Sequence, residues 1–240
     1  MANRIPEASA GPRADEIPFE LPRVTVAAKR RAESLLAALR RHYPDAHCEL
    51  RYSSPQELLV ATILSAQATD AGVNKATPAL FARFPTPADY AAATPGEIEP
   101  YIRSIGLFRN KARAIHAAMT AVAERFGGSV PRTMDELLTL RGVARKTANV
   151  VLGNAFGVNN GFVVDTHIER LSGRFGLVRR GTTVAMIERY LMALFPREAW
   201  CEASHMIIWH GRRACPARGR CCSEHPICRE FGKACELERA

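Results

Sequence analysis

Residues Leu140 to Leu152 read LRGVARKTANVVL, and no other stretch of the chain is as informative about the fold. A helical segment leads into it from Thr133, Gly142 permits a tight turn, and a second helix is predicted to begin near Lys146. The free N–H groups at the start of that second helix can hold a phosphate oxygen. Such a hairpin would grip the DNA backbone without reading bases. The alternative is an ordinary corner between two helices of a bundle.

The rest of the chain also has a helical pattern. Ser or Thr followed three residues later by Glu, a sequence typical of helix starts, occurs at Ser54, Thr94 and Thr133. No alternating hydrophobic pattern of convincing length predicts a sheet. The sequence therefore predicts an all-α fold. Helices are expected at residues 26–41, 109–126, 146–156, 166–174, 184–195 and 199–209.

The composition points to a globular protein with a polyanionic partner. The 240 residues are 47% hydrophobic, and the formal net charge is +9, which favours nucleic acid. No apolar run approaches the roughly 18 residues that a membrane span needs. Residues 1–22 lack the apolar core of a secretory signal. We therefore expect no membrane partner and a cytoplasmic location.

The cysteines are concentrated at one end of the chain. Five of the seven lie after residue 214: Cys215, Cys221, Cys222, Cys228 and Cys235. Without a secretion signal, such a cluster favours metal or iron–sulfur ligation over disulfides. A zinc site also suits four Cys ligands, and a tail without metal is the third possibility. Because the segment after Gly211 has little apolar periodicity, we expect its folding to depend on the metal centre.

Taken together, these motifs resemble the endonuclease III family of DNA glycosylases. Residues 140–152 are similar to that family's helix–hairpin–helix, LPGVGRKTANVV, with Arg141 in place of Pro and Ala144 in place of the second Gly. Since Ala tolerates positive φ less well than Gly, a strained or reshaped turn is expected at Ala144. Residues 64–70, LSAQATD, match a second family signature without change, and residues 163–168, VVDTHI, resemble a third.

The resemblance implies two catalytic residues. Lys146 stands at the position of the family's nucleophile, which attacks the sugar C1′ and forms a Schiff base. Asp165 stands at the position of the second catalytic residue, whose carboxylate stabilises positive charge at C1′. Asp165 is also a good helix N-cap, and the two roles are compatible. Without the motif, a first-turn lysine such as Lys146 would be read as simply solvated.

The resemblance also implies a set of DNA contacts. Gln67 is expected to enter the duplex where the damaged nucleotide has been flipped out, and Leu107, in the loop at residues 105–112, to intercalate. Asp70 is expected to support that region. His167 is a candidate DNA contact, with a structural role as the alternative. The hairpin residues expected to contact DNA are Arg141, Gly142, Val143, Ala144 and Arg145.

The resemblance covers about residues 27–235 and implies two all-α lobes with the DNA cleft between them. One is a six-helix barrel at residues 48–158, with the helix–hairpin–helix at about 133–156. The other is a discontinuous iron–sulfur cluster domain made of residues 26–47 and 159–240. Residues 1–25 are expected to be a disordered tail.

The implied cofactor is a [4Fe–4S] cluster held by four thiolates. The family spacing is Cys-x6-Cys-x2-Cys-x5-Cys, and this chain departs from it because His225 stands where the third Cys is expected. Cys221 is the alternative to Cys222 as second ligand, and His225 is a further candidate. The predicted ligands are Cys215, Cys222, Cys228 and Cys235.

The sequence thus predicts a bifunctional DNA glycosylase and AP lyase of base excision repair. We expect a monomer that acts on double-stranded DNA with oxidised pyrimidines of the thymine glycol type or abasic sites, and that cuts 3′ of the abasic site by β-elimination. One alternative is a monofunctional glycosylase of the same fold, against which Lys146 argues. The other is a non-enzymatic helix–hairpin–helix DNA-binding protein, against which Lys146 and Asp165 together argue.

Overall fold

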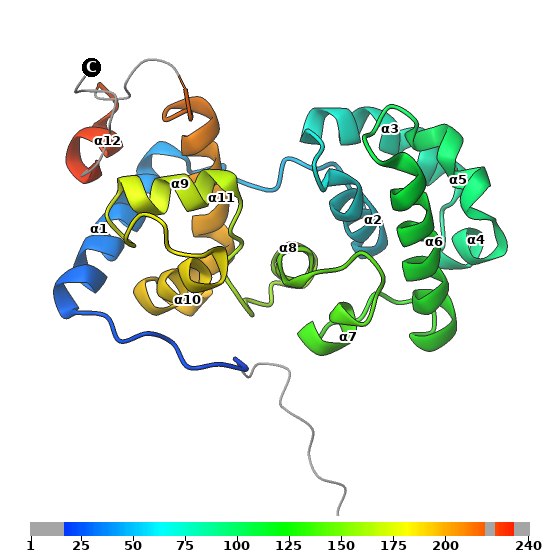
Figure 1. Ribbon diagram of the computed structural model, residues 1–240, viewed down its shortest axis with the longest axis horizontal. Helices are drawn as coiled ribbons and strands as arrows, with labels where there is room; N and C mark the ends of the chain where they lie inside the picture. Colours follow the sequence, from blue (N-terminus) through cyan, green and yellow to red (C-terminus); the bar gives the residue numbers. More distant parts are fainter. Residues whose placement is uncertain (1–16, 219–223, 233–240) are drawn as a thin grey trace, which may run out of the picture.

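The computed structural model consists of two helical lobes that lie side by side (Figure 1). It describes residues 17–218 and 224–232. Within these ranges no residue lies in a strand, so the all-α prediction is confirmed. None of the helices in the described ranges is both long and apolar enough to cross a lipid bilayer.

The first lobe, on the right in Figure 1, holds the helices of the middle of the chain. Their buried side chains form one core, which extends in sequence from Leu50 to Leu152. The short α7 leads into the hairpin, and the other six helices form the body of the lobe. The elements are α2 (Pro55–Ser65), α3 (Asp70–Arg83), α4 (Pro87–Ala92), α5 (Pro95–Ile102), α6 (Phe108–Arg125), α7 (Met134–Leu138) and α8 (Arg145–Phe156).

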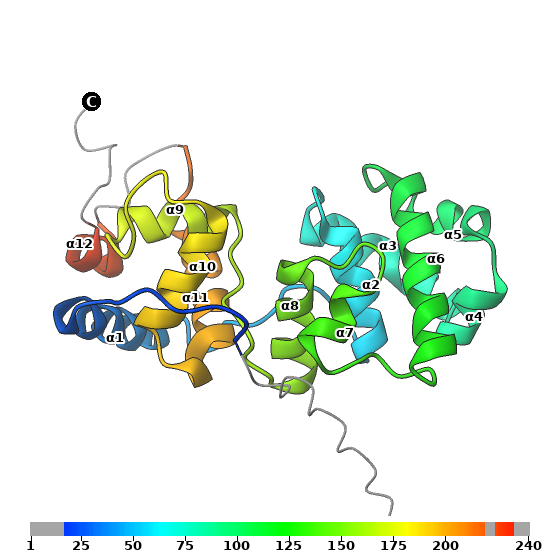
Figure 2. The same cartoon turned by 60° about the horizontal axis from the view of Figure 1, so that its bottom comes forward.

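The second lobe joins the first helix of the chain to its C-terminal helices. A separate core, from Ala32 to Phe231, holds them together. The chain crosses between the lobes after α1 and again after α8, which lies at the boundary in both views (Figure 1, Figure 2). The elements are α1 (Val26–His42), α9 (Thr166–Arg174), α10 (Val184–Leu194), a 3₁₀ turn (Arg197–Ala199), α11 (Trp200–Arg213) and α12 (Pro226–Phe231).

The helices begin where local capping chemistry predicts. The Ser54 hydroxyl accepts a hydrogen bond from the N–H of Glu57, and Pro55 occupies the first turn of α2. Thr133 accepts in the same way from the N–H of Glu136 at the start of α7. Helix ends are less well marked in the sequence. The helix expected at residues 199–209 begins at Trp200 and continues to Arg213.

Part of the predicted N-terminal tail is packed. Ile17, Phe19 and Leu21 lie against the core of the second lobe. The Phe19 ring also lies near two guanidinium carbons, 4.9 Å from that of Arg145 and 4.3 Å from that of Arg189. The prediction of disorder was wrong for residues 17–25, because alternate apolar side chains there meet a surface that composition does not reveal. Residues 1–16 lie outside the described ranges.

Candidate active site between the two lobes

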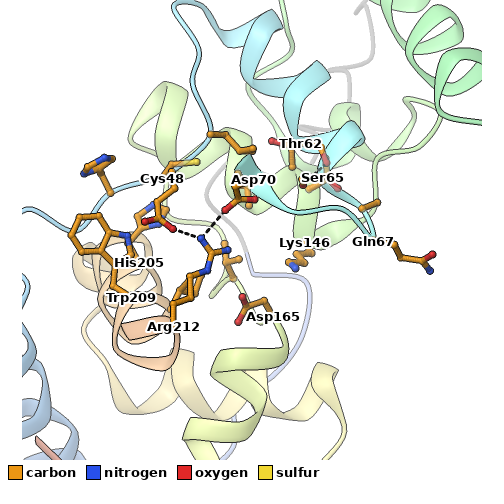
Figure 3. Close-up of a pocket in the computed structure, with 18 residues that line it drawn as sticks. Cys48, Thr62, Ser65, Gln67, Asp70, Lys146, Asp165, His205, Trp209 and Arg212 are labelled. Carbon is orange, nitrogen blue, oxygen red and sulfur yellow. Dashed lines mark hydrogen bonds and ion pairs between the residues drawn. The ribbon is translucent and has the colours of Figure 1, made fainter. Parts of the chain in front are cut away.

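A cavity of about 290 Å³ lies at the boundary between the lobes. Lys146 lines it from the first lobe and Asp165 from the second (Figure 3). Gln67 and Asp70, which follow the end of α2, also line it. The structure therefore brings together predicted site residues from three separate segments of the sequence. The walls of the cavity also include His47, Cys48, Glu49, Thr62, Ser65, Val163, His205, Trp209 and Arg212.

Lys146 lies in the first turn of α8, directly after the hairpin. Its side chain is exposed, and among the described residues it makes no hydrogen bond or ion pair. The hairpin turn depends on Gly142, which has φ of 83°. A Cβ at Gly142 would also lie 3.0 Å from the Cβ of Ala114, closer than side chains normally pack. Both constraints require glycine, so the turn that carries Lys146 is tightly defined.

The expected strain at Ala144 is absent. Ala144 has φ of −100° and ψ of 170°, an extended conformation that any residue adopts, and it is the N-cap of α8. The prediction was wrong because the turn takes its positive φ at Gly142 alone. No side chain caps α8, so the N–H groups of its first turn have no partner within the helix. That is the arrangement that a phosphate oxygen can satisfy.

One hairpin residue, Val143, is engaged inside the protein instead of facing solvent. Val143 is buried in the core of the first lobe, and its N–H donates to the carbonyl of Leu140 at 3.1 Å. Its side chain and its N–H are therefore both engaged within the protein, and its contact with DNA stays a prediction. Arg141 and Gly142 are exposed, as a DNA contact requires.

Arg145 turns toward the second lobe. Its Nε donates to Glu188 on α10 at 2.9 Å, and its Nη2 donates to the carbonyl of Asn160 at 3.1 Å. Asn149 on α8 donates to the same Glu188 carboxylate at 3.0 Å. Glu188 is nearly buried, and its burial raises its pKa despite these partners. The Arg145 side chain thus ties the lobes together, and its contact with DNA stays a prediction.

Asp165 is the N-cap of α9, as its position in the sequence predicts. Its Oδ1 accepts hydrogen bonds from the N–H groups of His167 and Ile168, both at 2.9 Å. Its Oδ2 has no hydrogen-bond partner among the described residues and is available to the cavity. One carboxylate can therefore fix the helix and face a substrate at once.

Gln67 and Leu107 have an unusual backbone. They are the two non-glycine residues with positive φ in the described part of the chain, at 55° and 60°. Both residues are exposed, and the apolar Leu107 has 58% of its surface accessible. A left-handed conformation in such residues costs free energy and tends to occur at functional sites. These are the two residues predicted to enter the DNA duplex.

Asp70 takes part in an ion-pair network at the cavity wall. Its Oδ2 accepts from Arg212 on α11 at 2.7 Å (Figure 3). The same guanidinium also pairs with Glu49. Arg213 donates to Glu49 at 3.0 Å and lies 3.5 Å from the centre of the Trp209 ring. Asp70 thus supports the cavity through a tie between the lobes.

The sequence did not identify one wall of the cavity. His205, Trp209 and Arg212 project from one face of α11, four and three residues apart. His205 Nε2 lies 2.8 Å from Asn154 Oδ1 on α8, a further link between the lobes, and burial lowers the His205 pKa to about 4. The helical spacing is the signal that could have found them.

His167 has a structural position. Its Nδ1 lies 3.2 Å from Arg170 Nη2, and its ring packs where a Cβ at Gly211 would lie 2.9 Å from it. Burial lowers the pKa of His167. It therefore fixes α9 against α11 and does not line the cavity.

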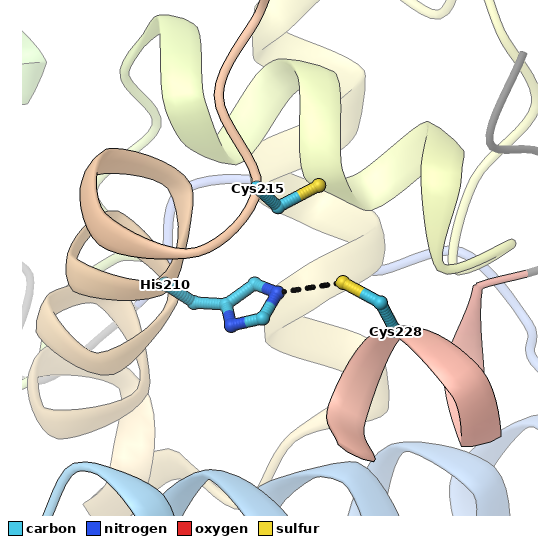
Figure 4. A group of neighbouring side chains, drawn as sticks. All are labelled: His210, Cys215 and Cys228. Atoms are coloured by element: carbon cyan, nitrogen blue, oxygen red, sulfur yellow. Dashed lines mark hydrogen bonds between the residues drawn. The ribbon is translucent and has the colours of Figure 1, made fainter. Parts of the chain in front are cut away.

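Two predicted metal ligands meet in the second lobe. Cys215, Cys228 and His210 are buried, and their ligand atoms lie within 4.8 Å of one another (Figure 4). Arg174 donates to Cys215 Sγ at 3.0 Å, which suits a thiolate. The donor set therefore fits a metal centre. Cys221, Cys222 and Cys235 lie outside the described residues.

His225, the further candidate ligand, is engaged in another way. Its Nδ1 accepts from the N–H of Ile227 at 3.2 Å and thereby caps α12. Its Nε2 lies 3.4 Å from the Tyr43 hydroxyl, which also contacts His210 at 2.8 Å. With both ring nitrogens engaged in these contacts, His225 is poorly placed to bind a metal.

Comparison with known proteins agrees with this geometry. Residues 60–197 match the model of the HhH-GPD superfamily base excision DNA repair proteins. Endonuclease III of a Synechocystis strain is 53% identical over 82% of this chain and 89% of its own, and that of Bacillus subtilis is 47% identical over 80% and 88%. A structure of a trapped endonuclease III–DNA covalent intermediate has 44% identity and a TM-score of 0.81, covering 88% of this chain and 97% of that one. The chain therefore belongs to the HhH-GPD superfamily of base excision DNA repair proteins and, within it, to the endonuclease III family of DNA glycosylase/AP lyases.

Proposed function

We propose that Lys146 is the nucleophile and Asp165 the charge-stabilising carboxylate in the excision of oxidised pyrimidines, such as thymine glycol, from double-stranded DNA. The observation that carries the proposal is that these two side chains, from different lobes, line one cavity. Lys146 has no partner among the described residues, so its amine is free to react. Because both residues come from one chain, the site is complete in a monomer.

The reaction follows from these positions. The Lys146 amine attacks C1′ of the flipped nucleotide, and the bond from C1′ to the base breaks as the base departs with the electron pair. The Asp165 carboxylate stabilises the positive charge that develops at the sugar. Opening of the sugar ring gives a Schiff base between Lys146 and C1′. Loss of a C2′ proton then expels the 3′ phosphate and cuts the strand.

DNA contacts would surround this cavity. The uncapped start of α8 and the exposed Arg141 would hold backbone phosphate, a contact that carries no base specificity. Gln67 and Leu107 would fill the space left by the flipped nucleotide, since the glycosidic bond cannot be reached in stacked DNA. The basic net charge of +9 would add attraction that weakens with salt.

Borohydride reduction tests the role of Lys146, because it traps a Schiff base covalently. The wild-type protein should be trapped on thymine-glycol DNA, and Lys146→Ala should give no adduct. Lys75→Ala, at an exposed lysine of the same lobe, is the matched control and should be trapped normally. An adduct formed by Lys146→Ala would reject the assignment.

Asp165→Asn separates the two roles of Asp165. The amide oxygen can still accept from His167 and Ile168, so α9 should keep its cap and the melting temperature should change little. Excision of thymine glycol should fall by roughly a hundredfold or more, because the charge is lost. Full excision with normal folding would leave Asp165 only as a cap.

We further propose that Cys215, Cys222, Cys228 and Cys235 hold a [4Fe–4S] cluster. The convergence of the buried Cys215 and Cys228 thiols supports this, as does the Arg174 hydrogen bond to Cys215. When bound, the cluster would supply iron–thiolate bonds that join the ends of α11 and α12. It would belong to a domain of residues 26–47 and 159–240, against a barrel domain of residues 48–158, in accord with the two separate cores.

Metal analysis distinguishes the options. The purified protein should be yellow-brown and contain close to four iron atoms per chain if the cluster is [4Fe–4S]. Cys222→Ser should lose the iron while Cys221→Ser keeps it, because only Cys222 preserves the family's six-residue first interval. The reverse result would exchange those two ligands. Zinc instead of iron after anaerobic purification would reject the cluster and leave the chemistry of Lys146 unaffected.

A further inference from the structure

Lys111 is a lysine buried in the first lobe, outside the catalytic cavity. It lies in the first turn of α6 and has 6% of its surface exposed. Its Nζ donates to the carbonyl of Leu64 in the last turn of α2 at 2.9 Å. No carboxylate pairs with it among the described residues, and burial lowers its pKa. Buried lysines are rare and costly, so we infer that Lys111 has a specific role at this position.

The electrostatic partner of Lys111 is the end of α2. The last four carbonyls of a helix have no partner within the helix, and the helix dipole favours a cation there. Helix α2 has no basic residue in its own last turn, and its C-cap, Ala66, has no side-chain donor. The ammonium group therefore fixes the point where α2 ends and the loop with Gln67 begins.

The backbone of Lys111 is attached to the other predicted DNA-entering loop. Its N–H donates to the carbonyl of Leu107 at 3.0 Å. Leu107 lies four residues before Lys111, and Gln67 lies three residues after Leu64. One residue thus contacts both segments that carry a non-glycine residue with positive φ in the described ranges.

The hairpin turn also packs at the junction of α2 and α6. A Cβ at Gly142 would touch Ala114 on α6 and Ile63 on α2, at 3.0 and 3.6 Å. The relative position of α2 and α6 therefore also sets where the hairpin turn lies. A shift at this junction would displace both inserting loops against the phosphate-holding turn.

We propose that Lys111 is a positioning residue that holds the Gln67 and Leu107 loops in register, and that it is needed for lesions in duplex DNA but not for lesions in single strands. The inference rests on the proposed insertion of Gln67 and Leu107. Flipping a nucleotide out of a duplex requires both loops to enter at fixed places, whereas an unpaired lesion reaches the cavity without them. Misplacement by about 1 Å can cost a hundredfold in rate.

The test compares one lesion in two settings. Lys111→Met keeps the length and apolar stem of the side chain but removes the charge and its N–H donors. Thymine-glycol excision should fall roughly ten- to a hundredfold on duplex DNA and should stay within about twofold of wild type on the single strand, where positioning of the loops is not needed. Lys29→Met, an exposed lysine in the second lobe, removes the same charge and should change neither rate.

A second readout does not depend on catalysis. In a Lys146→Ala background, 2-aminopurine placed opposite the lesion should fluoresce more when the protein unstacks the duplex. Adding Lys111→Met should abolish that increase, whereas adding Lys29→Met should not. If Lys111→Met does not fold, Lys111→Gln keeps an amide donor and should show the same duplex-selective loss to a smaller degree.

The outcomes separate this inference from the function on which it rests. Equal losses on duplex and single strand, or no loss on either, would overturn the role of Lys111. If Gln67→Ala and Leu107→Ala show duplex-selective losses but Lys111→Met does not, only the Lys111 inference fails. If Gln67→Ala and Leu107→Ala show no duplex-selective loss, the insertion roles fail and the inference falls with them. The loss of trapping in Lys146→Ala tests the nucleophile alone and does not depend on the roles of Gln67, Leu107 or Lys111.

Discussion

Glu188→Ala should destabilise the protein far more than loss of an ordinary surface ion pair. The Glu188 carboxylate accepts from Arg145 at 2.9 Å and from Asn149 at 3.0 Å, and its side chain is 12% exposed against 25% for that of Arg145. Removing it leaves the Arg145 guanidinium partly buried without a counter-charge. Breaking a buried pair in this way costs about 3–5 kcal/mol. The carboxylate is also closely packed against Gly161, where a Cβ would clash with Glu188 Oε1.

The pair of Arg40 and Glu202 provides a matched control. It has similar geometry, with a closest distance of 2.7 Å, but its side chains are 50% and 43% exposed. Exposed pairs contribute about 0–1 kcal/mol, so Glu202→Ala should have little effect. Replacing Arg145 and Glu188 together by Met should recover much of the loss, because no buried charge is then left unpaired.

Urea unfolding measures these differences directly. The two tryptophans, Trp200 and Trp209, both lie in the second lobe and report its unfolding by fluorescence, while far-ultraviolet circular dichroism follows both lobes. The reasoning fails if Glu188→Ala loses no more than about 1 kcal/mol, the range of an exposed pair. It also fails if the double Met variant loses the sum of the losses of Arg145→Met and Glu188→Met, since that would mean no coupling between Arg145 and Glu188.

Two further predictions follow from the site. Burial lowers the pKa of His205 from 6.5 in the unfolded chain to about 4 in the folded protein. Between these two pH values the unfolded chain binds a proton that the folded protein does not, so the folded protein keeps its full stability above pH 6.5 and loses stability as the pH falls toward 4. The loss in the free energy of unfolding amounts to about 3 kcal/mol. His205→Gln should remove that share of the acid destabilisation in urea unfolding, and an unchanged pH dependence would contradict the buried neutral imidazole. Gly142→Ala should cost about 1–3 kcal/mol and weaken abasic-site binding, because it forces positive φ on a side chain. Ala144→Gly, at an extended residue, should stay within about 1 kcal/mol and bind normally, and equal losses from both changes would contradict the observed turn.

Local chemistry made much of the fold predictable. Helix starts at Ser54 and Thr133 depend on side chains within three residues of the cap, so a short window of sequence contains the whole signal. The turn at Gly142 is equally local. The strain expected at Ala144 failed for a related reason: the family pattern has two glycines, but the pattern alone does not say which of them needs positive φ.

Contacts between distant segments limited the predictions for individual side chains. Arg145 lies in a DNA-binding motif, yet its partner Glu188 lies 43 residues further along the chain. Phe19 is held by cations of two different helices, which no local pattern shows. Arg212 lies beyond the predicted end of its helix, so its periodic relation to His205 was not apparent.

The ties between the lobes explain why the cavity exists where it does. Each lobe has its own apolar core, and the links around the cavity are polar: Arg145 to Glu188, Asp70 to Arg212, and Asn154 to His205. An apolar interface would bring the lobes into close contact and remove the space between them. Hydrogen bonds and ion pairs fix orientation through a few directional contacts and leave the intervening volume open. The alignment of Lys146 with Asp165 therefore depends on side-chain contacts that neither residue makes itself, and Glu188 carries the sharpest test of it.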